Sequence, residues 1–309
     1  MDISAVVVSF NSAKFLTQNL ESIFRQTIPF TQVIVVDNCS SDDSVSLITS
    51  FPAVEKIFSK TNCGYAAAAN IGIRRTQSDL VLVANADIYL ADDFNQEIVR
   101  FFMEHPQAFL LSPLILRFDR QTVDSAGQTY SLALHPREIS YERKLASSHF
   151  REREVFSVCG AATVFSRKGL EELKLGDEYY DEDFFMFWED FDIGWRANLF
   201  GLKAYFAPRA LAYHFRSGTL KRTWLSRFSL SLSRPAPLRF HLLKNRYLSL
   251  IKNFRLARFW WTLPFIFLKD LFWVCALTIT DPKIIIALIG SRDIFRRAFK
   301  KRSMIKKHE

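Results

Sequence analysis

Short, continuous apolar runs alternate with segments of helical periodicity along the first third of the chain. The apolar runs are typical of strands buried on both faces of a parallel sheet, and they lie at Ile3–Phe10, Val33–Val36, Val54–Phe58 and Leu80–Ala84. The segments between them predict helices, namely from Asn11 and Ser12 to about Gln26, from Ser41 or Asp42 to about Ser50, and from Tyr65 to Thr76. This alternation predicts right-handed βαβ units and an α/β fold with a mainly parallel sheet flanked by helices.

The pattern is less regular further along the chain. We predict strands at Phe109–Leu116, Val155–Phe165 and Ala204–Ala207, and helices over 94–105 and Ile193–Leu199. Residues 119–154 are polar and mixed in composition, so we expect a long loop or hairpin there. Long segments of this kind often cover a functional site.

Polar side chains follow each of the first four predicted strands. They are Ser9 and Asn11, Asp37 and Asn38, Asn62 and Gly64, and Asn85 and Asp87. Ligands bind at the carboxyl ends of the strands in open α/β sheets, so four polar groups on one edge predict a single site. The glycine patterns of dinucleotide-binding Rossmann domains and of P-loops are absent from the sequence.

Three of these strand ends suggest a chemical role. Asp37 can accept a hydrogen bond from a pyrimidine ring, or it can simply cap the turn that follows the strand. Gly64 allows close backbone approach, and the helix that starts at Tyr65 and contains Asn70 offers a positive N-terminus to a phosphate. Asp87, with Asn85, can provide oxygen ligands for Mg²⁺ or Mn²⁺, although a polar strand end explains the same residues.

An acidic and aromatic segment near the middle of the chain contains the best candidate for a general base. Glu189, Asp190 and Asp192 follow Trp188, and Arg196 lies four residues after Asp192. We expect Asp192 to pair with Arg196 on a helix, which leaves Asp190 to accept a proton from a substrate hydroxyl. His214 follows the last predicted strand, where it can contact a cation or a phosphate, or be a structural histidine.

Taken together, these motifs resemble family 2 glycosyltransferases, and within them the rhamnosyltransferase-like group. The matching strings occur in family order over roughly residues 3–220: Val7–Asn11, Val35–Asn38, Asn62–Tyr65, Asn85–Asp87, Cys159–Ala161, Trp188–Asp192, and His214 with Gly218. The resemblance implies a GT-A fold and transfer with inversion in bacterial surface polysaccharide synthesis, from a dTDP- or UDP-linked sugar, rhamnose favoured, to a glycan or a polyprenyl-diphosphate-linked acceptor.

The same resemblance implies a role for each candidate residue. Asp37 would contact the pyrimidine, Asp87 and His214 would lie at the metal and the donor diphosphate, and Asp190 would be the base. We place the donor among the other strand-end residues, which are Ser9, Asn11, Asn38, Asn62, Gly64, Tyr65, Asn70 and Asn85, and the acceptor beside Trp188 and Glu189. The usual DxD motif is Asn85-Ala-Asp87 here, and the QxxRW motif of processive members is missing, so we expect one sugar per encounter.

The charge of the chain is unevenly distributed. Residues 221–309 contain 20 of the 41 Lys and Arg residues but only 4 of the 32 Asp and Glu residues. Within this tail, Phe259–Leu268 and Leu271–Thr280 are apolar and are separated by Lys269 and Asp270. We therefore divide the chain into a catalytic domain, 1–220, and a helical, membrane-associating region, 221–309, that lies on an anionic membrane surface. A single membrane span is one alternative for this region, and a core or homo-oligomer interface is another.

The remaining features concern location and rival functions. The four cysteines show no metal-ligand spacing and predict free thiols. The first residues lack the basic and apolar regions of a signal peptide, so we expect the protein on the cytoplasmic face of the inner membrane. A nucleic-acid-binding tail is disfavoured because its charges are separated by long apolar runs. Two rival hypotheses stay open: a family 2 transferase with a UDP-hexose or UDP-N-acetylhexosamine donor, and a non-catalytic GT-A scaffold.

Overall fold

A large mixed β-sheet forms the centre of the molecule. The computed structural model describes residues 1–147, 150–216 and 235–307. The sheet has the order β10-β12-β6-β11-β4-β1-β2-β3, with β5 paired to β12 and β7 paired to β6, and a separate hairpin pairs β8 with β9. The strands are β1 Ile3–Ser9, β2 Gln32–Asp37, β3 Glu55–Phe58, β4 Leu80–Asn85, β5 Ile88–Leu90, β6 Ala108–Arg117, β7 Val123–Ser125, β8 Gln128–Tyr130, β9 Pro136–Glu138, β10 Arg153–Val155, β11 Ala162–Ser166 and β12 Lys203–His214.

Helices cover both faces of this sheet, because its inner strands are apolar at nearly every position. One face packs on α1 (Ala13–Phe24), α2 (Ser44–Thr49) and α4 (Phe94–Glu104), through residues such as Ala5 and Val7 of β1. The other face packs on α3 (Tyr65–Arg75), α5 (Arg167–Glu172) and α6 (Glu189–Leu199), through Val6 and Val8. The alternation of neighbouring residues between two cores follows from the two-residue repeat of a strand, and it confirms the predicted α/β class.

The parallel pairing of β1 with β2 and β4, and of β2 with β3, is as predicted. The single strand predicted at Val155–Phe165 is wrong. β10 ends at Val155 on one edge of the sheet, and β11 begins at Ala162 between β4 and β6, antiparallel to both. The residues between β10 and β11 do not belong to a strand. Among them, the backbone N–H of Gly160 donates to the carboxylate of Asp190. The helix predicted at Ile193 begins four residues earlier, so Glu189 and Asp190 belong to its first turn.

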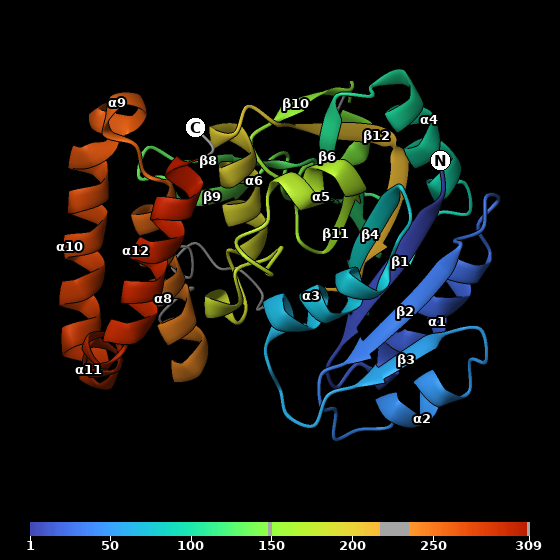
Figure 1. Cartoon of the computed structure of the whole chain (residues 1–309), viewed down its shortest axis with the longest axis horizontal. Coiled ribbons are helices and arrows are strands. Elements are labelled where there is room, and N and C mark those ends of the chain that lie inside the picture. Colours follow the sequence, from blue (N-terminus) through green and yellow to red (C-terminus); the bar gives the residue numbers. More distant parts are fainter. Residues whose placement is uncertain (148–149, 217–234, 308–309) are drawn as a thin grey trace.

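The C-terminal helices pack against the α/β part of the molecule. They are α8 (Ala236–Asn253), α9 (Leu256–Phe259), α10 (Leu263–Thr280), α11 (Pro282–Gly290) and α12 (Arg292–Lys306). Figure 1 shows α8 and α12 between α10 and the sheet-containing part. Leu248, Phe259 and Ile305 share one apolar cluster with Phe191 and Trp195 of α6. The described helices are therefore continuous with the core around α6, and the boundary expected at residue 220 lies outside the described residues, as does Gly218.

A buried network of ion pairs joins these helices to the acidic segment. Lys252 of α8 donates to Asp181 and, at 2.9 Å, to Asp192, while Lys301 of α12 donates to the other oxygen of Asp181. Asp192 also accepts from Arg196 at 3.1 Å, as the sequence predicted. Burial alone would raise the pKa of Asp181, but the charges of Lys252 and Lys301 outweigh burial and hold that pKa well below its usual range. Part of the basic tail thus neutralises acids inside the protein.

The outer helices carry an exposed apolar surface, which we call the α9–α11 face. Its large exposed side chains are Leu256, Trp260, Trp261, Leu263, Phe265, Phe267, Leu268, Leu271, Phe272, Ile279, Ile286 and Ile289. Within the described residues, one helical segment, Leu256–Thr280, is long and apolar enough to cross a membrane, with a mean hydropathy of 1.7 and 11% of its apolar window buried. An apolar surface of this kind typically marks an interaction site.

We predict that Lys252→Met destabilises the fold by about 3–5 kcal/mol, because it leaves two buried carboxylates without their shared cation. Denaturant unfolding of both variants measures this. Arg296→Met is the matched control, since Arg296 pairs with Asp293 on the surface, where both side chains are more than three-quarters exposed. Equal unfolding midpoints for the two variants would contradict a stabilising role for the buried network.

Candidate active site

The carboxyl ends of β1 and β2 are tied together by the residues predicted to lie there. Asn11, at a φ of 49°, accepts hydrogen bonds from the backbone and hydroxyl of Ser41. The two carboxylate oxygens of Asp37 accept from the backbone N–H and the hydroxyl of Ser40, and the residue is 1% exposed. In this structure Asp37 therefore caps the turn after β2. Ser9 is buried, and its hydroxyl has no hydrogen-bond partner among the described residues.

Asn38 and Asn62 connect β2 to the loop before α3. The Asn38 amide donates to Asn62 Oδ1 at 3.0 Å, and Asn38 Oδ1 accepts from the backbone of Cys63 at 2.9 Å. Asn62 Oδ1 also accepts from the backbone of Gly64. These hydrogen bonds fix the shape of the loop beside the strand ends. A loop of fixed shape can hold a ligand in one position.

The start of α3 is occupied by contacts within the protein that the sequence did not predict. Gly64 does adopt a positive φ of 86°, but the residue that approaches it is Phe185, whose atoms lie 2.5–2.7 Å from where a Cβ would stand. The carbonyl of Phe185 accepts from the N–H of Ala66, so this helix terminus already has an acceptor. Asn70 is fully buried and bonds the backbone N–H and carbonyl of Tyr180. Both residues therefore hold the acidic segment in place.

Asp87 and His214 meet after β4 and at the end of β12. His214 Nε2 lies 3.3 Å from Asp87 Oδ1, and His214 Nδ1 lies 2.8 Å from the buried Asp124, which also bonds Arg216. Burial alone would lower the pKa of His214, but the hydrogen bonds to Asp124 and Asp87 raise it to about 9. Asn19 supports the turn by donating to the carbonyls of Asn85 and Ile88.

The Asp87–His214 pair suits a divalent cation. Neighbouring ligands around one Mg²⁺ ion are about 3 Å apart at the usual bond length of about 2.1 Å, and the two facing atoms here are 3.3 Å apart. Asp124 fixes the histidine ring through Nδ1, which leaves Nε2 to the ion, as outer carboxylates do at many metal sites. A bound cation would take the place of the proton on Nε2.

Asp190 lies in the first turn of α6 and is held on three sides. Its Oδ2 accepts from the backbone of Gly160 at 2.8 Å and from Gln128 at 2.9 Å, and its Oδ1 accepts from its neighbour Phe191. A Cβ on Gly160 would stand 3.1 Å from the carboxylate, so this approach favours glycine. Tyr65 donates to the carbonyl of Gly160 at 3.0 Å. Burial raises the pKa of Asp190 above the usual aspartate range, which makes it a stronger base.

The segment 123–138 contacts both the Asp87 side and Asp190, through neighbouring residues of β7 and the β8–β9 hairpin. Asp124 bonds His214, and the adjacent Ser125 donates to Glu138. Glu138 accepts from the amide of Gln128 at 2.8 Å, and the same amide nitrogen donates to Asp190. Burial, opposed by the Ser125 bond and reinforced by the charge of Asp190, raises the pKa of Glu138 to about 7. The segment 123–138 thus links the Asp87–His214 pair to Asp190.

Trp188 and Glu189, expected beside an acceptor, point into the protein. Trp188 is 4% exposed and packs edge-on against Phe191 and His135, and Glu189 is 8% exposed. Burial and the charge of Asp190 raise the pKa of Glu189 to about 8. These two residues support the helix of Asp190 from within, so their predicted contact with an acceptor is not supported by this structure.

The backbone before Asp190 has strained φ angles and is held by hydrogen bonds from α8. Phe185, Phe187 and Trp188 have φ values of 65°, 69° and 72°, a region that bulky residues seldom adopt. Asn245 of α8 donates its side-chain amide to the carbonyls of Phe184, Met186 and Phe187 at 2.7–3.0 Å. The C-terminal helices therefore hold the conformation that places the first turn of α6.

Sequence reasoning missed Asp124, Gln128, Glu138 and Asn245. The first three lie in residues 119–154, which the sequence marks only as a polar segment that could cover a site. The string Asp124-Ser-Ala-Gly127 was the available signal, because it places a carboxylate beside small residues and a glycine. Asn245 gives no local signal, because its partners are about 60 residues away.

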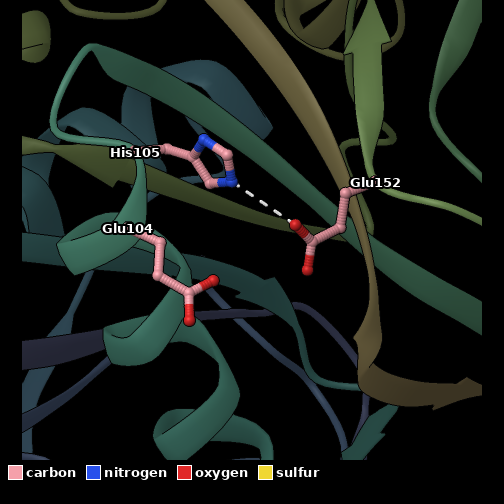
Figure 2. A group of neighbouring side chains, drawn as sticks. All are labelled: Glu104, His105 and Glu152. Carbon is pink, nitrogen blue, oxygen red and sulfur yellow. Dashed lines mark hydrogen bonds and ion pairs between the residues drawn. The ribbon is translucent and has the colours of Figure 1, made fainter.

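A second group of potential metal ligands lies elsewhere. Figure 2 shows Glu104, His105 and Glu152, with His105 Nε2 3.3 Å from Glu152. They lie near the amino ends of β6 and β12, the end of these strands away from Asp87. Arg100 pairs with both Glu104 and Glu152, at 2.6 and 3.2 Å. The arginine already neutralises these carboxylates, so we assign the group to stabilisation of α4.

Comparison with known proteins shows the family of the chain. Residues 4–174 match the model of the family described as Glycosyl transferase family 2. The chain is 23% identical over 228 residues to a poly-β-1,6-N-acetyl-D-glucosamine synthase of Staphylococcus epidermidis. That match covers 73% of this chain and 52% of the synthase, so the chain spans about half the length of this relative.

Two solved structures have a similar fold. One is GalNAc-T7 with UDP, GalNAc and Mn²⁺, at a TM-score of 0.61 and 15% identity over 82% of this chain and 48% of that one. The other is residues 1–349 of S. aureus TarS in complex with UDP-GlcNAc, at a TM-score of 0.55 and 18% identity over 84% of this chain and 69% of that one. At these identities the likeness shows the GT-A fold alone.

We predict that Glu138→Gln gains stability relative to the wild type, by about 3 kcal/mol, as the pH rises from 4 to 8. The folded-state pKa of Glu138 is about 7, above the unfolded value of about 4.3. The glutamate therefore contributes most when protonated, and that contribution is lost as the pH rises through 7. Denaturant unfolding across this pH range measures the difference. The exposed Glu21→Gln serves as control, and a parallel pH dependence for both variants would contradict the prediction.

Proposed function

This chain belongs to glycosyl transferase family 2, and we propose from that premise that it moves a sugar from a UDP-linked donor to a glycan acceptor in bacterial surface polysaccharide synthesis. The observation that supports this most directly is that one short segment, 123–138, bonds His214 of the Asp87–His214 pair through Asp124 and bonds Asp190 through Gln128. A cation site for a diphosphate and a buried carboxylate base are the two parts that sugar transfer needs.

An N-acetylhexosamine is the favoured sugar. The relative from S. epidermidis is named for N-acetyl-D-glucosamine, and the TarS structure was solved with UDP-GlcNAc. These names support a UDP-N-acetylhexosamine over the rhamnose that the family resemblance favoured, and neither relative carries a rhamnosyl name. We therefore replace rhamnose by an N-acetylhexosamine in the proposal.

Asp87 and His214 would hold the divalent ion, with Mn²⁺ or Mg²⁺ suited to this oxygen and nitrogen pair. When bound, such an ion neutralises the charge that develops on the leaving diphosphate. Arg216, which shares Asp124 with His214, adds a positive charge on the same side. The nucleotide would lie along the strand ends near Ser9, Asn11, Asp37 and Asn38, with Asn62, Tyr65 and Asn85 at its border.

Asp190 would take the proton from the acceptor hydroxyl as that oxygen attacks the anomeric carbon. The bond from this carbon to the diphosphate oxygen breaks in the same step, and UDP leaves, so a single displacement inverts the anomeric configuration. The bonds from Gly160, Gln128 and Phe191 fix the carboxylate, which reduces the entropy lost in reaching the reactive geometry. The missing QxxRW motif supports the transfer of one sugar per encounter.

The α9–α11 face would place the enzyme on the cytoplasmic surface of the inner membrane. Its exposed Trp260 and Trp261 suit the headgroup region, and the exposed Lys283 and Arg292 suit anionic lipid. Asp270 and Lys269 interrupt the middle of the apolar segment, and Asp270 pairs with Arg246 of α8. This pairing favours a helix that lies on the membrane beside the protein over one that crosses it.

We predict that Asp190→Asn lowers the transfer rate by about 10³-fold while UDP binding persists, because the amide cannot accept the proton. Asp177→Asn, an exposed change in the same acidic segment, is the control. Steady-state transfer assays and calorimetry with UDP measure the two properties separately. Turnover of Asp190→Asn near the wild-type rate would remove this residue from the role of base.

The proposed donor is tested by thermal unfolding with UDP-GlcNAc, UDP-GalNAc and dTDP-rhamnose, each with and without Mn²⁺. We expect UDP-N-acetylhexosamines with Mn²⁺ to stabilise the wild type by about 3 kcal/mol at about 100 times their Kd. Asp87→Ala should lose the part of this stabilisation that depends on Mn²⁺, and the control Asp93→Ala, an exposed change, should keep it. Stronger stabilisation by dTDP-rhamnose would overturn the donor proposal, and an unchanged response of Asp87→Ala would overturn the ion site.

A further inference from the structure

Three cationic side chains gather where the β8–β9 hairpin meets α8 and α10. Arg246 of α8 donates to the carbonyl of Ala133 in the hairpin at 2.9 Å, and to Asp270 of α10 at 2.6 Å. Lys269 precedes Asp270, and Arg137 lies on β9. We call Arg137, Arg246 and Lys269 the hairpin cation cluster.

This cluster has more positive charge than its surroundings neutralise. Asp270 is the one carboxylate that bonds a member of it within the described ranges. Arg246 is 3% exposed, and its Nη2 has no hydrogen-bond partner in the part of the chain that the structure describes. Lys269 is partly buried on α10. A buried donor without an acceptor is costly, and three positive charges, with Arg137 exposed at the edge, face one carboxylate, so the cluster suggests a missing anion.

The charges of the cluster act on one another and on His135. Burial and the charges of Arg246 and Arg137 lower the pKa of Lys269 to about 8. Burial and the charge of Lys269, followed by those of Arg246 and Arg137, lower the pKa of His135 to about 3. The histidine is therefore neutral at pH 7, and the three cations are close enough to share one anionic ligand.

The position of the cluster relates it to both the membrane face and the base. Lys269 lies on α10 one turn from the exposed Phe265 and Phe272. Arg137 is next to Glu138, and successive side chains of a strand point to opposite faces. Glu138 bonds Gln128, which bonds Asp190. Arg137 of the cluster therefore lies on one face of the hairpin, and Glu138, which connects to Asp190 through Gln128, lies on the other. The apolar α9–α11 face is next to the cluster through Lys269.

We propose that the hairpin cation cluster binds the phosphate groups of a lipid-linked acceptor whose hydrocarbon chain lies along the α9–α11 face. This inference rests on the proposed sugar transfer, and it names the acceptor class and where its anionic part is held. Guanidinium groups bind phosphate through paired hydrogen bonds, and an ammonium group adds a compact charge. An acceptor held there by its phosphate would present its terminal sugar hydroxyl from a fixed membrane-side anchor.

The test measures binding of the full chain to phosphatidylcholine vesicles that contain either a polyprenyl phosphate or, at equal surface charge, phosphatidylglycerol. Lys269→Gln and Arg137→Gln remove cluster charges, whereas Lys283→Gln removes one exposed charge from α11 outside the cluster. Flotation of the vesicles gives the bound fraction. Calorimetry with UDP on the same variants reports the donor side.

We expect Lys269→Gln and Arg137→Gln each to weaken binding to polyprenyl phosphate vesicles about tenfold, the loss for one charge-assisted hydrogen bond. Their binding to phosphatidylglycerol vesicles should fall only as far as that of Lys283→Gln. Equal losses of binding for all three variants, or equal losses on both kinds of vesicle, would overturn the proposal that the cluster binds phosphate. General attraction to anionic lipid would then explain the binding. Wild-type preference for polyprenyl phosphate without sugar transfer would instead overturn the proposed function and leave the cluster standing.

Discussion

The buried ion network around Lys252 is the constraint on which the rest of the structure depends. One ammonium group lies between Asp181 and Asp192, and Lys301 completes the charge balance from α12. These acids lie on both sides of the strained backbone at Phe185, Phe187 and Trp188. Removing one member of a buried pair leaves an uncompensated charge. The network therefore couples the packing of α8 and α12 to the position of α6, and so to Asp190.

The segment 123–138 has the complementary role on the other side of the base. Asp124 fixes His214 and Arg216, and Gln128 with Glu138 fixes Asp190. The proposed cation site at the end of β12 and the proposed base on α6 need a common support if their spacing is to be maintained. One short stretch of chain provides it through buried hydrogen bonds, which are strong in a low-dielectric interior.

The β8–β9 hairpin also contacts the C-terminal helices. Ala133 binds Arg246, which binds Asp270 of α10, and Arg137 adds to the charge there. The basic residues of the C-terminal region thus serve two purposes that composition cannot distinguish. Lys252 and Lys301 neutralise buried acids, whereas residues such as Lys283 are exposed and would be available to the proposed anionic surface. The acidic front and the basic tail of the sequence are in part the two halves of one internal network.

The sequence alone determined the parallel β1–β4 core, the alternation of side chains between two helix layers, the strand-end location of the polar residues and the Asp192–Arg196 pair. These follow from periodicity and spacing over a few residues. Only the tertiary structure decided that Gly64, Asn70, Trp188 and Glu189 support the site from within, and that Asp124, Gln128 and Asn245 belong to it. The reason is distance along the chain: Lys252 meets Asp192 across 60 residues and Lys301 meets Asp181 across 120, and no local pattern encodes which distant partner a buried polar group will find.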